Sequence, residues 1–306
     1  MKVLQNKKKL RAYREFLYIF PFILLITIFA YYPLYGWVYA FFDYRPPMPM
    51  TMDNFVGLKW FKSLVENPVK TKQILGVIQN TFAMSGLTIL TSWLPMIFAV
   101  FLNEIKLVRF RKFVQTVTTI PNFISWVLVY SVAFNIFNST GMVNHLLVSI
   151  GIIEKPILFL QSSEHVWLTQ WLWLTWKNLG WAAIMYIAAI TGIDEELYEA
   201  AKVDGASRMQ RIRYITIPSI LPTYFVLLML AIASFLSNGM EQYYVFQNAF
   251  NKESIQVLDL YVFNLAMGSG SYSVSTALSI LKSVISVVLL CIANGFSKLV
   301  RGESFF

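Results

Sequence analysis

Two lysines are the residues of this chain whose surroundings are most unusual for their type. Lys177 lies within "WLWLTWKNLGW", and Lys282 lies within another long apolar run. Because charge is costly inside a bilayer, both are candidate functional residues. Trp173, Trp176 and Asn178 accompany Lys177, and such groups can stack on sugar rings and hydrogen-bond hydroxyls. Two lysines facing one path would favour an anionic sugar such as a uronate. The alternative is that the lysines bind helix carbonyls or snorkel, and that the tryptophans form an interfacial belt.

Other residue types that carry chemistry are sparse. Glu241 and Gln242, in "NGMEQYY", are candidates for contact with a sugar or with an external protein, although solvation explains them equally well. His145 and His165 lack the spacing of metal ligands, and the single cysteine, Cys291, excludes a disulfide framework. We therefore expect no metal site and no cofactor in this chain.

The composition indicates a membrane protein. The 306 residues are 57% hydrophobic and 13% charged, with a mean hydropathy of +0.57. A soluble domain carries about a quarter charged residues. The net charge of +9 does not indicate nucleic-acid binding, because the cations gather at the ends of apolar segments.

Six segments have the length and apolarity of a membrane-spanning helix, which needs about 20 residues. They are Phe16 to Phe42, Gly76 to Leu102, Phe113 to Phe137, Trp167 to Thr191, Ser219 to Ser237 and Ser275 to Ser297. Lys and Arg concentrate in the loops 1–15, 103–112, 192–218 and 298–306, which predicts that these loops and both termini are cytoplasmic. We expect a basic N-terminus (1–15), one transmembrane domain (16–298) and a cytoplasmic tail (299–306).

Two other classes of protein fit less well. A secondary transporter is expected to use membrane carboxylates for ion coupling, and the six predicted spans contain none. A membrane-embedded enzyme needs clustered catalytic groups, and no such cluster is visible. The chain also lacks a phosphate-binding Gly-x-x-x-x-Gly-Lys-[Ser/Thr] motif, so any nucleotide chemistry belongs to another subunit.

The loop 192–218 is unusually elaborate for a membrane connection. Asp194 is a good N-cap for a short helix, and Gly205 is suited to a turn with positive φ. Ser207 with Gln210 predicts a capping box for a second short helix, which we expect Pro218 to close near the first turn of the next span. From these signals alone, an ordinary interfacial connection is also possible.

The segment "EAAKVDGASRMQRIRYITIP" resembles the loop that marks permease subunits of binding-protein-dependent ABC importers. The family pattern is Glu-Ala-Ala, three residues, Gly, nine residues, Ile-x-Leu-Pro; here Ile217 replaces the leucine. "GLKWFKSLVENP", "QNTFAMS", "GMVNHLL", "WKNLGWAAIMYIAAI" and "NGMEQYYVFQN" resemble the carbohydrate-uptake branch, especially permeases associated with lipoprotein and complex-polysaccharide uptake.

The resemblance implies an all-α, type I (MetI-like) permease fold in the bacterial inner membrane and a role in sugar or oligosaccharide import. An importer for peptides or other small solutes is the alternative. The implied partners are a second homologous permease, a dimeric ATPase that uses Mg-ATP, an external binding protein, a glycan and membrane lipid. The loop would transmit ATP-driven motion through Glu199, Ala200, Ala201, Asp204, Gly205, Ile215 and Pro218.

Overall fold

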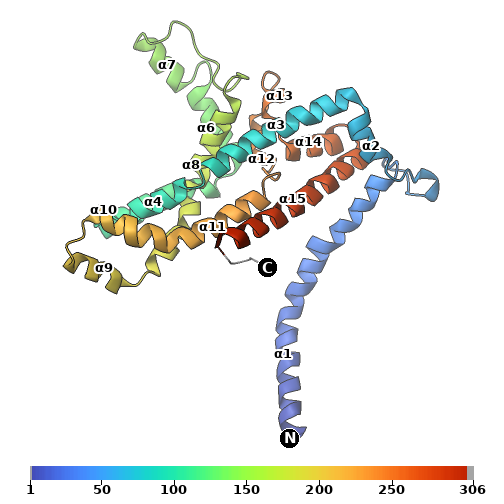
Figure 1. Cartoon of the computed structure of the whole chain (residues 1–306). Helices are drawn as coiled ribbons and strands as arrows, with labels where there is room; N and C mark the ends of the chain where they lie inside the picture. The colour runs from blue at the N-terminus through green and yellow to red at the C-terminus, as the bar shows by residue number, and fades with distance from the viewer. Residues whose placement is uncertain (1, 302–306) are drawn as a thin grey trace. The chain divides into compact units, whose positions relative to one another are not determined.

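The computed structural model describes residues 2–301, without the side chains of residues 2–12, 296, 297 and 299–301. Every regular element in that range is a helix, and the one β-feature there is an isolated bridge between Phe42 and Phe55 (Figure 1). The predicted all-α class is confirmed. Of the predicted cytoplasmic tail, residues 302–306 lie outside the described range.

The chain forms two compact units, and the first comprises the residues up to 66 together with 265–280. Its helices are α1 (Lys2–Ile26), η1 (Thr27–Tyr31), η2 (Tyr32–Phe41), η3 (Met52–Asn54) and α2 (Lys59–Glu66), with η6 (Asn264–Gly268) and the start of α15 (Tyr272–Arg301). The Ser273 hydroxyl donates to the Phe42 carbonyl at 2.7 Å and accepts from the Tyr44 amide at 3.0 Å. These bonds join the end of the first predicted span to the beginning of the last.

The second unit comprises residues 67–264 and the chain from 281 onward. It holds α3 (Pro68–Leu90), α4 (Leu94–Asn103), α5 (Val108–Thr119), η4 (Ile120–Phe123), α6 (Trp126–Phe137), α7 (Met142–Ser149), α8 (Val166–Thr191), α9 (Glu195–Val203), α10 (Arg208–Arg211), η5 (Ile212–Thr216), α11 (Ile217–Ala233), α12 (Glu241–Phe246), α13 (Lys252–Ile255) and α14 (Leu258–Phe263), with the rest of α15. One core cluster packs α3, α6, α12 and α14 around Val166, at the start of α8. The other packs α4 and α11 against Ala183 and Tyr186 of α8. Helix α8 is therefore the central element of this unit.

Within the described residues, five helical segments are long and apolar enough to cross a membrane. They are Tyr13–Phe41, Pro68–Asn103, Trp126–Ser149, Arg208–Ala233 and Tyr272–Gly295. Helix α8, the fourth predicted span, has 26 residues but is not among them. Its Gln170, Lys177 and Asn178, together with several tryptophans, lower its hydropathy. The count of six spans and the orientation of the termini stay predictions.

The third predicted span, 113–137, is not one helix, so that prediction is wrong. Helix α5 ends at Thr119, a 3-10 turn follows over Ile120–Phe123, and α6 starts at Trp126 after the Ser125 N-cap. Pro121 lacks an N–H, and its ring interferes with a preceding carbonyl, so it interrupts the α-helical hydrogen bonding. The interruption leaves carbonyl groups that need partners from elsewhere in the fold.

Candidate functional site

The first short helix of the loop 192–218 forms as the sequence predicted. Asp194 caps α9 by accepting the Glu196 amide at 3.0 Å. At the other end, Gly205 has φ +75°, the Gly205 amide donates to the Lys202 carbonyl, and the Ala206 amide donates to the Ala201 carbonyl at 2.8 Å. This pair of bonds is a Schellman cap, which fixes the direction in which the chain leaves the helix. The predicted N-cap and glycine turn are confirmed.

The second short helix, α10, also has its predicted cap. The Ser207 hydroxyl accepts the Gln210 amide, and the Gln210 side chain accepts the Ser207 amide at 2.7 Å. The prediction that Pro218 closes this helix is wrong, because the chain stays helical from Arg208 through α11. The π-turn η5 precedes Pro218, which occupies the first turn of α11 as expected. A π-turn re-pairs the backbone where proline offers no N–H.

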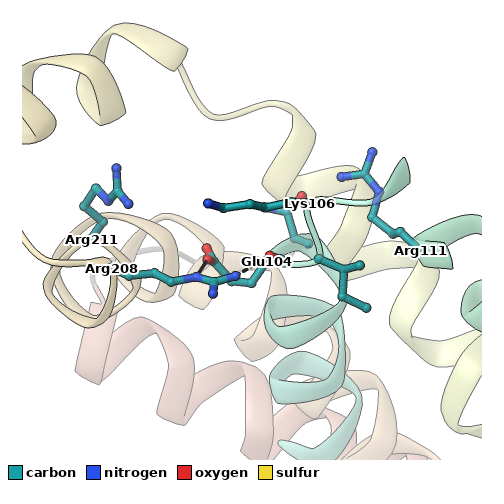
Figure 2. Close-up of a pocket in the computed structure, with 7 residues that line it drawn as sticks. Glu104, Lys106, Arg111, Arg208 and Arg211 are labelled. Atoms are coloured by element: carbon teal, nitrogen blue, oxygen red, sulfur yellow. Dashed lines mark hydrogen bonds and ion pairs between the residues drawn. The ribbon is translucent and has the colours of Figure 1, made fainter. Parts of the chain in front are cut away.

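Two contacts that the sequence did not predict hold this loop at its base. The Tyr198 hydroxyl of α9 is 2.9 Å from the Thr216 hydroxyl of η5, and Thr216 is buried. The Arg208 guanidinium of α10 donates to the Glu104 carboxylate and to the Glu104 carbonyl at the end of α4 (Figure 2). The two short helices of the loop are therefore attached to neighbouring elements of the same unit, α9 to η5 and α10 to the end of α4.

The residues of the family pattern lie on the accessible part of this loop. Glu199, Ala200, Asp204 and Gly205 are exposed, whereas Ala201 is partly exposed. Ile215, like Ala201, is partly exposed, and Pro218 is exposed. Figure 1 shows α9 and α10 at the same end of the second unit as the C-terminal end of α4. A small, exposed alanine surface beside a carboxylate is thus presented by a connection that its caps make stiff.

Lys177 has a specific structural environment inside the fold. Its ammonium donates to the carbonyl oxygens of Pro121, Asn122 and Ile124 at 2.9, 2.7 and 2.7 Å. These are carbonyls of the interruption between α5 and α6. The neighbouring Asn178 accepts from the Asn122 side-chain amide at 3.0 Å. The alternative stated for Lys177, binding of helix carbonyls, describes this arrangement.

The three carbonyls use every N–H of the Lys177 ammonium. Its side chain is also 6% exposed, and Trp126 lies over it with the ammonium 5.4 Å from the ring centroid. No donor is left for a substrate, so we assign Lys177 the role of holding the helix interruption. Pro121 was the sequence signal for this partner, because a proline inside a span frees backbone carbonyls.

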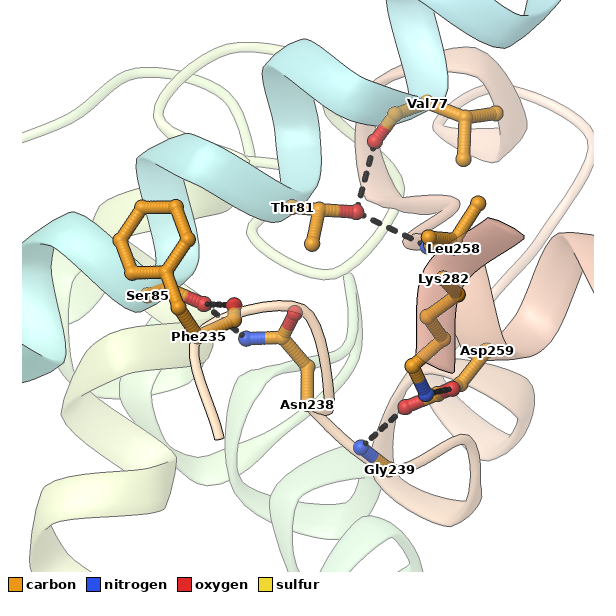
Figure 3. A network of polar contacts seen from close by, with 9 residues as sticks. All are labelled: Val77, Thr81, Ser85, Phe235, Asn238, Gly239, Leu258, Asp259 and Lys282. Carbon is orange, nitrogen blue, oxygen red and sulfur yellow. Dashed lines mark hydrogen bonds and ion pairs between the residues drawn. The ribbon is translucent and has the colours of Figure 1, made fainter. Parts of the chain in front are cut away.

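Lys282 forms an ion pair with Asp259 of α14, which the sequence analysis did not identify (Figure 3). Asp259 also accepts the Gly239 amide at 2.8 Å, and both side chains of the pair are less than a quarter exposed. The pair joins the end of the loop after α11 to α14 and α15. The snorkelling alternative stated for Lys282 therefore does not describe this arrangement.

The polar groups beside Asp259 continue the same network in Figure 3. The Asn238 amide donates to the Ser85 hydroxyl at 2.9 Å, and Ser85 donates to the Phe235 carbonyl. The Thr81 hydroxyl accepts the Leu258 amide at 2.9 Å. These bonds attach the segment after α11 and the start of α14 to α3.

The remaining predicted substrate residues divide by exposure. Gln242 is buried, and its amide donates to the Gln170 carbonyl at 2.8 Å, whereas Glu241 is exposed. Trp173 is half-buried and packs edge to face with Trp176, which is 47% exposed. Trp176 and Glu241 therefore remain accessible for contact, whereas Gln242 is engaged inside the fold.

Titratable and metal-binding chemistry is limited in the described part of the chain. Burial raises the pKa of the Tyr243 phenol, and the nearby Asp259 charge adds to the rise, so Tyr243 stays protonated at neutral pH. No group of three His, Cys, Asp or Glu residues among the described residues could hold a metal ion. The accessible chemistry is that of an aromatic surface and a charged, projecting loop.

A family model described as "Binding-protein-dependent transport system inner membrane component" matches residues 108–302. The chain belongs to this family. Membership confirms the predicted permease fold and the predictions that the chain is a transport subunit rather than an enzyme and a multi-pass inner membrane protein. It also means that this permease works with a solute-binding protein.

Relatives of this permease match it over almost its whole length. Protein LplB of Bacillus subtilis (strain 168) is 35% identical over 95% of this chain and 90% of its own length. The polygalacturonan/rhamnogalacturonan transport system permease protein YteP of the same organism is 36% identical over 95% of this chain and 89% of its own.

A solved structure has the same fold. It is a bacterial alginate ABC transporter in complex with an alginate pentasaccharide-bound periplasmic protein. One of its chains matches this permease with a TM-score of 0.85 and 31% identity, covering 97% of this chain and 98% of the other.

Proposed function

We propose that this permease forms half of the translocation pathway of an ATP-driven importer for a complex glycan, delivered by an external binding protein. The observation that carries the coupling part of this proposal is the loop 192–218, which presents the family pattern on a doubly capped connection. A second, homologous permease supplies the other half of the pathway. A separate dimeric ATPase supplies Mg-ATP hydrolysis, since the chain has no phosphate-binding loop of its own.

Coupling assigns a role to each exposed feature of the loop. Glu199 engages the ATPase surface, while Ala200 and Ala201 permit close approach. Gly205 sets the direction of the connection between α9 and α10 through its positive φ. The contacts of Tyr198 with Thr216 and of Arg208 with Glu104 transmit displacement of the loop to α11 and α4. A stiff connector between elements with two arrangements is what such transmission requires.

The substrate class rests on the similar proteins. One relative is named for transport of polygalacturonan and rhamnogalacturonan, and the solved neighbour imports alginate. All three of these polysaccharides contain acidic sugars, so an oligosaccharide containing uronate is the first substrate to test. The argument from two lysines facing one path no longer supports an acidic substrate, because carbonyls occupy Lys177 and Asp259 occupies Lys282.

Recognition of the sugar by this subunit is then aromatic rather than cationic. Trp176 and Trp181 are 47% and 49% exposed on α8, and Trp181 packs edge to face with Phe123. Exposed indole faces can stack on the apolar faces of sugar rings. We assign neutralisation of the uronate charge to the binding protein and the partner permease.

Co-purification tests the assembly. The tagged chain is extracted from its native membrane in mild detergent, and the proteins that accompany it are identified by mass spectrometry. We expect an ATPase with a Walker motif and a second six-span permease. Recovery of the chain alone or as a homo-oligomer, with no ATPase after crosslinking, would contradict the coupling role of the loop and favour a secondary transporter.

The recovered complex then tests the substrate. Reconstituted with its binding protein in liposomes, it is assayed for ATPase stimulation by oligogalacturonides and by neutral oligosaccharides of equal length. Stimulation by either supports glycan import, and a preference for the acidic series supports the uronate assignment. Stimulation by peptides but by neither glycan series would exclude the proposed substrate class.

A further inference from the structure

A cationic cavity opens beside the base of the loop 192–218, at the end of α4. It has a volume of about 530 Å³, and its lining comes from the α4–α5 connection, α5 and α10: Asn103, Glu104, Ile105, Lys106, Arg111, Arg208 and Arg211. In Figure 2 the Lys106 side chain extends from the connection toward Arg208 and Arg211 of α10. The α4–α5 connection and α10, which are separate in the sequence, thus bring cations toward one another, whereas Arg111 of α5 lies at the other end of the lining (Figure 2).

The charge of this cavity is not balanced. Its lining includes four cations and the single carboxylate of Glu104, which is already paired with Arg208. Among the residues that the structure describes, no carboxylate forms an ion pair with Lys106, Arg111 or Arg211. The guanidinium of Arg208 has five N–H donors, so its contacts with Glu104 leave some of them available. The cavity is therefore suited to an anion.

The position of the cavity at the ends of two candidate spans favours a lipid headgroup over a free anion as its ligand. One candidate span, Pro68–Asn103, ends at Asn103, and another, Arg208–Ala233, begins at Arg208. Both of these terminal residues line the cavity. Because both segments are long and apolar enough to cross a membrane, we expect their polar ends to meet the headgroup region, where basic pockets between helices bind acidic lipids.

Apolar side chains adjoin these cations in the sequence. Leu107, directly after Lys106, is 65% exposed, and Phe110, directly before Arg111, is 50% exposed. Met209, directly after Arg208, is 65% exposed. Cations interleaved with exposed apolar groups are typical of a surface at the boundary of headgroups and acyl chains. A free inorganic anion has no use for those apolar groups.

We propose that this cavity binds the phosphate of an acidic membrane phospholipid, on the leaflet that faces the loop 192–218. Arg211 and Lys106 contact the phosphate, because a guanidinium group matches its oxygens in a bidentate manner and lysine adds a point charge. The acyl chains lie against Leu107, Phe110 and Met209. The bound lipid connects the α4–α5 connection with α10, and this role goes beyond the proposed import function.

Lipid binding is measured on the full tagged chain in a neutral detergent by native mass spectrometry. Phosphatidylglycerol and phosphatidylcholine of identical acyl chains are titrated separately, and inorganic phosphate is a third arm. We expect phosphatidylglycerol to be retained at least about tenfold more strongly than phosphatidylcholine. Lys106→Gln combined with Arg211→Gln should lower its affinity about 25-fold, at about fivefold for each cation.

The matched control removes two exposed cations elsewhere in the second unit, Lys72→Gln with Lys252→Gln, and should leave the lipid preference unchanged. If the double pocket variant fails to elute as a single species in gel filtration, Lys106→Gln alone replaces it, with an expected loss of about fivefold. Equal retention of the two lipids, or an unchanged preference in the pocket variant, overturns the proposal.

Two further outcomes identify a different ligand. Displacement of phosphatidylglycerol by millimolar inorganic phosphate would make the ligand a free anion and overturn the lipid assignment. Unchanged lipid binding together with loss of the co-purified ATPase in the pocket variant would make the cavity a protein-docking surface, which also overturns it.

Discussion

Lys177→Met separates a structural role for this lysine from contact with substrate. Methionine has a similar volume but no donor, so the carbonyls of Pro121, Asn122 and Ile124 lose their partner in a buried place. Water cannot easily replace the ammonium as the partner of these carbonyls, because Lys177 is only 6% exposed. The expected effect is therefore on the stability of the chain itself, before any transport is measured.

The magnitude follows from the three hydrogen bonds. Each bond to a charged group contributes roughly 1.5–3 kcal/mol. Removal of the ammonium also removes the cost of burying its charge, which is several kcal/mol and offsets part of this loss. The difference gives a net destabilisation of about 3 kcal/mol, at the lower end of the range for breaking a buried ionic contact. For a chain of this size, that corresponds to a fall in melting temperature of about 5 °C.

The assay is thermal unfolding of the purified full chain in detergent, followed by scanning fluorimetry. Trp176→Met is the matched control, since Trp176 is adjacent to Lys177 and 47% exposed; we expect its melting temperature to change by less than about 2 °C. A Lys177→Met variant with the melting temperature of the wild type but poor import would refute the structural assignment. It would instead support contact between Lys177 and the substrate.

Three further predictions concern the loop and the packing of α8 and α14. Gly205→Pro should abolish import and leave membrane insertion intact, because proline cannot adopt φ +75°, and Glu199→Lys should do the same; normal uptake by well-expressed variants would disprove coupling through this loop. Gly180→Ala should destabilise the chain by about 1–3 kcal/mol, since its Cβ would lie 2.3 Å from the Thr118 carbonyl oxygen. Gly86→Ala meets nothing within 4 Å and should be neutral or stabilising in the same thermal assay; equal effects of the two would argue against close packing of α8 on α5. Asp259→Asn should cost about 2 kcal/mol by leaving Lys282 unpaired, and adding Lys282→Met should recover most of that loss in thermal unfolding; a double variant less stable than the single would contradict the ion-pair account.

Local structure was readable from the sequence because its causes are local. The cap at Asp194, the Schellman turn at Gly205 and the capping box at Ser207 each depend on residues within a few positions of one another. The same is true of the spacing that indicated the permease family. The interruption at Pro121 was equally local and was missed because hydropathy alone was used to define that span.

The sequence by itself determined that this is a helical membrane permease with a capped loop, since apolar length and local backbone chemistry leave few alternatives. Only the tertiary structure decided what the charged groups do. Lys177 meets carbonyls more than fifty positions away, and Lys282 meets Asp259 on another helix. The partner of a long charged side chain depends on which helices pack beside it, and no local pattern encodes that choice. The cationic cavity likewise exists because packing brings the end of α4 to α10.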